Sequence, residues 1–255
     1  MENELQVPLF NRSRKNTSLT IQGKYFLQYA EEIVKLYENS KEHLKQLYDL
    51  NEGTLYFGAT NFIGVYLIPE LIREYQIKYE KIKINMLISS SRKLFDLLEK
   101  HQIEFGFFSH YIHVDHNKYV TETFCLDHMV LIVSKDHPLA QRTHCDLSEI
   151  KNNTFIMKNA DASLNRFLEE KLGILDFAKK MIISNQEGIK HAVLHNLGIS
   201  IMSEKSVEIE VKAGLIKTLE LDNYNLNREI HIIYHRKKHI TPAGRIFLDL
   251  CKKNI

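Results

Sequence analysis

The sequence predicts an α/β protein of two similar lobes, preceded by a long helix. Short β-like runs alternate with helical runs after Gly53, and the alternation restarts after a hinge-like run that begins at Thr123. A long stretch without proline stands before both series. Alternating strands and helices are typical of a parallel sheet with helices on its faces. A chain of 255 residues is long enough for one large or two modest domains.

The composition narrows the class of protein. Hydrophobic residues make up 44% of the chain and charged residues 26%, as in soluble globular proteins. The formal net charge of +2 is too small to indicate nucleic-acid binding by itself. Cys125, Cys145 and Cys251 form no CxxC pair, which favours a reducing compartment. No apolar run reaches the roughly 20 residues that span a bilayer, and MENELQ is not a signal peptide, so we expect a cytoplasmic protein.

The long helix is predicted over about residues 20–52. Thr20 is the expected N-cap, and the only glycine of the run, Gly23, lies in the first turn. Eight positions follow three- and four-residue spacing, as in a coiled-coil seam, and two of them, Ser40 and His43, are polar. The apolar positions are Phe26, Tyr29, Ile33, Leu36, Leu47 and Leu50. The pattern fits an amphipathic helix packed on its own domain or a dimerisation helix. A helix of this length has little of its own domain to lie against, so we expect dimerisation.

The loop before this helix, NRSRKNTS, concentrates basic side chains. Its candidates for DNA contact are Arg12, Arg14, Lys15 and Asn16. Cations among small hydrogen-bonding side chains suit phosphate contact and insertion into a narrow minor groove. A solvated charged turn has the same composition, so the loop alone does not separate the two interpretations.

Two Rossmann-like lobes are predicted behind the helix, within residues 53–255. Lobe I comprises about residues 54–126 and 228–255, and lobe II about residues 127–227, with two crossing strands as the hinge. Open α/β sheets bind ligands at the carboxyl ends of their strands, and interfaces between domains favour pockets. The cleft between the lobes is therefore the predicted site for a small molecule.

Small polar side chains follow several of the predicted strands. The candidate binding residues are Thr60, Asn61, Ser89, Ser90, Ser91, Ser109, Asn159, Asp161 and Ser163. Hydroxyl and N–H groups at the starts of helices can hold a carboxylate or similar anion. The same residue types also cap helices without binding anything. Their joint placement at one sheet edge in both lobes favours a small-molecule site.

Catalytic and metal-binding interpretations have less support. The dense clusters of metal-capable side chains, YIHVDH near His113 and THCD near His144, lack HExxH or CxxC spacing. No GxSxG, P-loop or GxGxxG motif is present. Cys125 fits a buried thiol, with redox sensing as an open alternative. We therefore expect no enzyme, no metal and no cofactor.

The run ENELQVPLFNRSRKNTSLTIQGKYFL resembles the segment around the wing of LysR-type transcriptional regulators. The positions that carry the resemblance are Glu4, Leu5, Leu9, Phe10, Arg12, Lys15, Leu19, Thr20 and Gly23. The resemblance continues in GTLYFGATNFIGVYLIPELI, SKDHPLA, EGIKHAVLHNLGISIM and TPAGRIFLDL, and so covers essentially the whole chain.

This resemblance implies a periplasmic-binding-protein-like effector domain of two lobes. Residues 1–19 would be the remnant of a winged helix-turn-helix and residues 20–52 the linker helix. Promoter DNA and a small-molecule effector would be the partners, with dimers or tetramers and no chemistry on the ligand. By motif position, Thr60 and Asn61 match the family's first ligand-contacting turn, and Ser90, Ser91 and Ser163 fall in its other polar turns.

In that family a recognition helix precedes the wing, and here only Met1 stands before ENEL. A start placed downstream of the true one, a truncated gene and a short natural form would each explain this, and we expect the first. Without that helix the chain is expected to bind DNA weakly and still to dimerise. The alternative function is a two-lobed solute-type binding protein without DNA binding. The sequence leaves open the effector, the promoter, and activation or repression.

Overall fold

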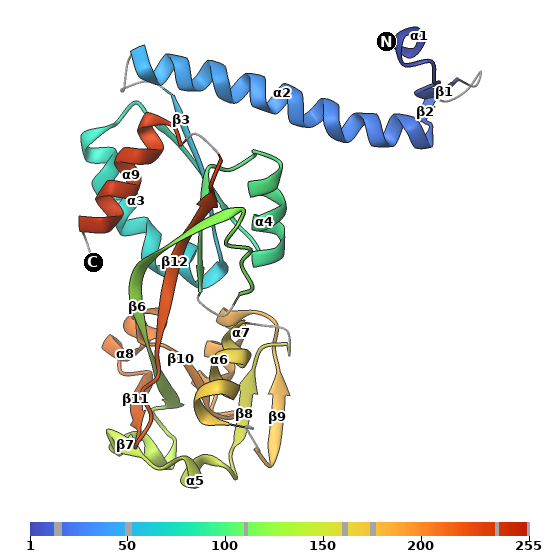
Figure 1. Cartoon of the computed structure of the whole chain (residues 1–255). Coiled ribbons are helices and arrows are strands. Elements are labelled where there is room, and N and C mark those ends of the chain that lie inside the picture. The colour runs from blue at the N-terminus through green and yellow to red at the C-terminus, as the bar shows by residue number, and fades with distance from the viewer. Residues whose placement is uncertain are drawn as a thin grey trace.

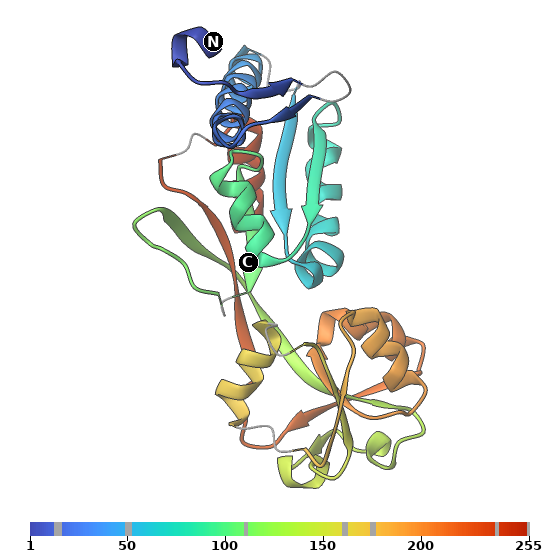
Figure 2. The ribbon, with the colours of Figure 1, turned by 90° about the vertical axis from the view of Figure 1, so that its right-hand side faces the viewer.

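The computed structural model describes residues 1–12, 17–48, 53–109, 112–159, 163–173, 177–237 and 240–253. Two lobes stand one above the other, and a long helix crosses the far end of the first lobe (Figure 1). Two strands, β6 (Tyr119–Ser134) and β12 (Asn227–His235), run from one lobe into the other in both views (Figures 1 and 2). The predicted α/β, two-lobed class is confirmed.

The N-terminal segment folds against the start of the long helix α2 (Ile21–Tyr48). It comprises α1 (Glu2–Leu5) and the antiparallel strands β1 (Phe10–Arg12) and β2 (Thr17–Leu19). Leu9 is buried, and a Cβ added at Gly23 would lie 2.0 Å from the Leu9 carbonyl oxygen. Only glycine permits so close an approach. Arg14, Lys15 and Asn16 lie outside the described residues, as does the side chain of Arg12.

Helix α2 begins where the sequence predicts. The hydroxyl of Thr20 accepts a hydrogen bond from the Gly23 amide at 2.9 Å, which satisfies an amide of the first turn. Among the described residues, the later part of the helix contacts lobe I: Asn39 Nδ2 donates to the His101 carbonyl at 2.9 Å, and Lys35 Nζ lies 5.1 Å from the centroid of the Tyr56 ring. The first half projects beyond the lobe and carries the β1–β2 hairpin away from it (Figure 1).

Lobe I is built on strands in the order β4–β3–β5–β12–β6. Its further elements are β3 (Thr54–Ala59), the π-helical turn η1 (Ile63–Leu67), α3 (Ile68–Lys78), β4 (Lys83–Ile88), α4 (Ser91–Glu99), β5 (Phe105–Ser109) and α9 (Pro242–Lys253). β3, β4 and β5 are parallel, as predicted, whereas β12 runs antiparallel to β5 and β6. Every residue of β5 is buried, which is typical of a central strand covered on both faces.

Lobe II surrounds the second half of β6. Its elements are η2 (Pro138–Gln141), β7 (His144–Cys145), α5 (Leu147–Ile150), β8 (Thr154–Met157), α6 (Ser163–Leu172), β9 (Lys179–Ile182), α7 (Gln186–Leu194), β10 (Ser200–Ser203), η3 (Glu204–Val207), α8 (Glu208–Lys212) and β11 (Ile216–Leu221). Side chains of β6 alternate between two cores: Leu131 and Val133 face one, Val130 and Ile132 the other.

The hinge is an antiparallel pair of strands with a buried ion pair across it. The sequence predicts β6 from Thr123, but the strand starts earlier, at Tyr119, because it first pairs with β12 inside lobe I. Asp127 of β6 stands opposite Arg228 of β12, and Arg228 Nε donates to Asp127 Oδ2 at 2.7 Å. Strand pairing and this ion pair thus set which residues of β6 and β12 stand opposite each other where the strands cross between the lobes. None of the described helices is long and apolar enough to cross a membrane.

Candidate functional site

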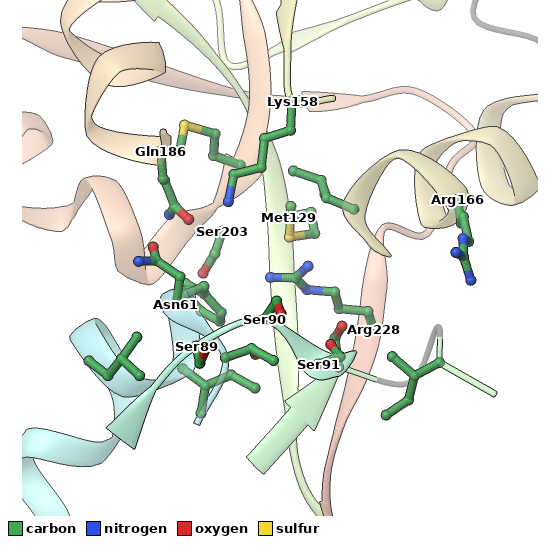
Figure 3. Close-up of a pocket in the computed structure, with 18 of the residues that line it drawn as sticks. Asn61, Ser89, Ser90, Ser91, Met129, Lys158, Arg166, Gln186, Ser203 and Arg228 are labelled. Atoms are coloured by element: carbon green, nitrogen blue, oxygen red, sulfur yellow. The ribbon is translucent and has the colours of Figure 1, made fainter. Parts of the chain in front are cut away.

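A cavity of about 680 Å³ lies between the lobes, at the carboxyl ends of β3, β4 and β5 (Figure 3). The small polar residues that the sequence predicts from lobe I all line it: Thr60, Asn61, Ser89, Ser90, Ser91 and Ser109. They meet there because parallel strands end at the same edge of a sheet, so the turns that follow them come together. Whether these side chains bind an effector stays a prediction.

Ser90 shows that helix capping and cavity lining are compatible. Its hydroxyl oxygen accepts a hydrogen bond from the Lys93 amide at 3.3 Å, which caps α4. Capping uses Ser90 only as an acceptor, so its hydroxyl can still donate to a ligand. The neighbours Ser89 and Ser91 line the same wall of the cavity.

In lobe II the structure differs from the sequence prediction. Asn159 is exposed and is not among the residues that line the cavity, and its carbonyl accepts a hydrogen bond from Asn165 Nδ2 at 2.7 Å. The preceding residue, Lys158, points into the cavity instead (Figure 3). Successive side chains in extended backbone point in opposite directions. The residue that enters the cavity is therefore Lys158, and the predicted residue one position later, Asn159, points away from it. Asp161 and the side chain of Ser163 lie outside the described residues.

The cavity is lined by four cationic side chains and, in the part of the chain that the structure describes, by no carboxylate. The cations are Arg92, Lys158, Arg166 and Arg228. Sequence reasoning missed them because it considered only small polar residues after strands. Lys158 was detectable, since it directly follows β8, whereas Arg228 enters the cavity from a hinge strand. Apolar side chains such as Met129 and Met202 line the remaining wall.

Arg228 is held in place on several sides. Its side chain is only 7% exposed, and Asp127, which accepts its hydrogen bond, also accepts one from Ser203 Oγ at 2.5 Å. Its guanidinium group lies 5.0 Å from the centroid of the Phe62 ring in lobe I. A guanidinium fixed in this way is preorganised, so it loses little freedom when a ligand binds.

Lys158 is a partly buried cation of this lining. Burial lowers the pKa of its ammonium group, and the nearby positive charge of Arg228 lowers it further. No described acidic side chain forms an ion pair with it, whereas Arg228 is paired with Asp127. Lys158 and Arg228 approach the same space from opposite sides, with Ser90 nearby (Figure 3). An anion in that space would compensate the charge of Lys158 and accept hydrogen bonds from all three side chains.

The cysteines and histidines show no comparable arrangement. Burial raises the pKa of Cys145 to about 11 and those of Cys125 and Cys251 to about 12, so the thiols stay protonated and weakly nucleophilic at neutral pH. His113, Asp115, His116 and His144 are exposed. Within the described ranges no three His, Cys, Asp or Glu side chains gather as a metal site would require.

Helix α2 presents uncovered apolar side chains. Tyr29, Ile33 and Leu36 are more than half exposed, and Phe26 is partly buried. Leu50 and the side chain of Leu47 are outside the described part. Exposed residues of this kind in one stripe mark a surface that another chain can cover.

Comparisons with known proteins agree with this architecture. The family model of the LysR substrate binding domain matches residues 49–255. The chain is 26% identical over 256 residues to the HTH-type transcriptional regulator CysL of Bacillus subtilis (strain 168), covering 100% of this chain and 85% of that protein.

Solved structures show the same fold. The effector binding domain of QuiR in complex with shikimate has a TM-score of 0.69 and 17% identity, and the match covers 80% of this chain and 97% of that chain. Full-length CbnR complexed with its target DNA has a TM-score of 0.73 and 15% identity, with 100% of this chain and 86% of that chain covered.

The family match spans both lobes, the hinge strands and the cavity between them. The relative CysL adds the N-terminal segment and α2 to the region of similarity. The chain therefore belongs to the LysR family of transcriptional regulators, with an effector-binding domain in its two lobes.

Proposed function

We propose that this LysR-type regulator senses a small organic anion in the cavity between its lobes. The observation that carries the proposal is the charge of the lining. The described lining residues include four cationic side chains and no carboxylate, and no described acidic side chain pairs with Lys158. Serine hydroxyls and apolar side chains complete the wall. This combination suits a compact ligand that has a carboxylate or another oxyanion at one end and a less polar body.

The similarity to the shikimate complex of QuiR supports the proposal. That domain shares the two-lobed fold, and its named ligand is small enough for a cavity of about 680 Å³. At 17% identity the likeness extends to the fold and not to the ligand. For this chain we propose only the chemical class, an oxyanion, and not a particular compound.

Ligand binding is proposed to act through the arrangement of the lobes. The side chains that line the cavity come from both lobes, so a bound anion favours the lobe arrangement in which both sets reach it. The exposed stripe of α2, with Ile33 and Leu36, is proposed to pair with a second copy of the chain. The effector domain would thereby be linked to promoter DNA contacts near Arg12 in the cytoplasm. Nothing in this mechanism requires chemistry on the ligand.

Titration calorimetry tests the proposal directly. The chain is titrated with shikimate, citrate, phosphate and sulfate, and with glucose as an uncharged comparison. We expect at least one anion to bind and glucose not to bind. Lys158→Met, which keeps the side-chain length and removes the charge, should weaken binding by about tenfold, because a charge-assisted hydrogen bond is lost.

Lys217→Met is the matched control. Lys217 is an exposed lysine of the same lobe that does not line the cavity, so its removal changes the net charge equally and should leave affinity unchanged. Equal weakening in both variants would show that only net charge matters. Binding of glucose with no binding of anions would contradict the proposal.

A further inference from the structure

The lobes contact each other at a second place besides the hinge strands. Tyr66 lies in η1 of lobe I, and Glu187 lies in the first turn of α7 in lobe II. The hydroxyl of Tyr66 donates a hydrogen bond to the Glu187 carboxylate. Lys190, one turn further along α7, places its ammonium 5.3 Å from the centroid of the Tyr66 ring. We call this group, Tyr66, Glu187 and Lys190, the interlobe latch.

Lobe II holds its half of the latch firmly. Lys190 Nζ lies 3.0 Å from Glu187 Oε2 and 2.7 Å from Glu210 Oε1 of α8, and its side chain is only 5% exposed. The Glu187 side chain is 54% exposed, and its contact with the buried Lys190 ammonium orients the carboxylate for the hydrogen bond from Tyr66. Tyr66 is the part of the latch that comes from the other lobe.

The ionisation states suit this hydrogen bond. Burial and the bond to Glu187 raise the pKa of Tyr66, so the phenol keeps its proton. Burial raises the pKa of Glu187, but hydrogen bonds from Tyr66 and Lys190 outweigh it and leave that pKa lowered. At neutral pH the protonated phenol of Tyr66 thus donates to an ionised Glu187 carboxylate. Hydrogen bonds to ionised acceptors are stronger than those between neutral groups.

The latch adjoins the cavity without lining it. The cavity is lined in lobe I by three residues at the start of η1 and just before it, Asn61, Phe62 and Ile63. In lobe II it is lined by Gln186 and Ile189 of α7. Tyr66, Glu187 and Lys190 are not among the lining residues. The two elements that the latch joins, η1 of lobe I and α7 of lobe II, therefore both contribute side chains to the lining of the same cavity.

We propose that Tyr66 is a positioning residue, which through Glu187 holds the two walls of the cavity at the separation that an anionic effector requires. The inference rests on the proposed function of the cavity. Two strands are a flexible connection, so the lobes can adopt several arrangements, and only some of them are competent to bind. The apparent dissociation constant rises in inverse proportion to the fraction of molecules that are competent to bind. Tyr66 thus controls affinity without touching the ligand.

The test compares two Tyr→Phe variants. Tyr66→Phe removes the hydroxyl that links the lobes and keeps the ring over which Lys190 lies. Tyr119→Phe removes a hydroxyl that donates to Glu99 at 2.6 Å, a Tyr–Glu bond within lobe I alone. Each variant loses one Tyr–Glu hydrogen bond, so a change that arises only from lower overall stability would appear in both variants.

The first readout is the distance between the lobes in the ligand-free chain, measured by pulsed electron paramagnetic resonance. Spin labels are attached at Ile77→Cys in lobe I and Ile209→Cys in lobe II, where the native side chains are 71% and 78% exposed. The native thiols react slowly because burial raises their pKa values. We expect a broader distance distribution for Tyr66→Phe, and the parent distribution for Tyr119→Phe.

The second readout is the affinity for shikimate and phosphate. We expect Tyr66→Phe to weaken anion binding about fivefold and Tyr119→Phe to leave it unchanged. Glu187→Ala removes the same bond from the other lobe and should reproduce both results. The double variant should be no weaker than either single variant, because both act through one interaction.

The outcomes separate this inference from the proposed function. An unchanged distance distribution in Tyr66→Phe and Glu187→Ala overturns the latch, whatever the affinities are. Equal effects in Tyr66→Phe and Tyr119→Phe overturn it too, since they would reflect general stability. If the parent chain binds none of the four anions of the titration, the proposed effector class fails, and the distance measurement still decides whether the latch holds the lobes.

Discussion

At the scale of single residues, two cations in the cavity differ in how their charge is balanced. Arg228 is paired with buried Asp127, while Lys158 has no acidic partner among the described residues. A buried charge without a partner lowers stability, and a bound anion restores the balance. The charge of Lys158 thus lowers the stability of the free protein, and the proposed anion would offset that cost. Two predictions follow from this difference.

The first prediction concerns Lys158 and pH. Its pKa is lowered in the folded protein, so below that pKa the charged form opposes folding and favours anion binding. Lys158→Met should therefore raise the melting temperature of the ligand-free chain while it weakens anion binding. In the parent, affinity should fall as the pH rises through the lowered pKa of Lys158, and the variant should lose this dependence. A lower melting temperature in the variant would contradict this account; thermal melts and calorimetry across alkaline pH measure both effects.

The second prediction concerns Asp127, whose side chain is 1% exposed. Asp127→Asn leaves the Arg228 charge uncompensated and should destabilise the free chain by about 3 kcal/mol in denaturant unfolding. An anion should then stabilise the variant more than it stabilises the parent. Asp136→Asn is the control, because that carboxylate is 68% exposed and its ion pair with Lys135 is a surface one. Equal effects of the two substitutions would refute the assigned role of the hinge pair.

At the scale of elements, α2 has two parts with different surroundings. The later part contacts lobe I through Asn39, and the earlier part projects from it with Tyr29, Ile33 and Leu36 uncovered. The spacing of apolar residues fits a helix packed on its own domain or a dimerisation helix, and the length of the helix favours dimerisation. The structure shows that lobe I covers only part of the helix. The exposed stripe is the basis of the proposed dimer.

A charge placed in that stripe should prevent the pairing. Ile33→Glu is expected to shift the chain from dimer toward monomer, since a buried unpaired carboxylate opposes association. Gln28→Glu adds the same charge at an exposed position away from the stripe and should leave the dimer intact. Analytical ultracentrifugation at several concentrations measures the difference. A monomeric parent chain, or a dimer that tolerates Ile33→Glu, would rule out this role for the stripe.

At the scale of the whole molecule, local patterns predict the architecture better than the site. Strand and helix periods and turn residues are local features, so the two lobes and the serine-lined edge could be predicted. Arg228 reaches the cavity because β12 pairs with β6 across a long sequence separation, which no local pattern reveals. Lys158 directly follows β8 and was detectable, but it is a long cation and not one of the small polar residues that the sequence pattern singled out. The latch joins Tyr66 to Glu187, and that contact exists only in the assembled fold.

The central claim is that the cavity binds an oxyanion through groups from both lobes. A crystal structure of the chain with the best-binding anion of the titration panel tests this most directly. The account predicts the anion within hydrogen-bonding distance of Lys158 Nζ and of the Ser90 hydroxyl, beside the guanidinium of Arg228. An anion bound elsewhere on the molecule, with no anion in the cavity between the lobes, would contradict the account.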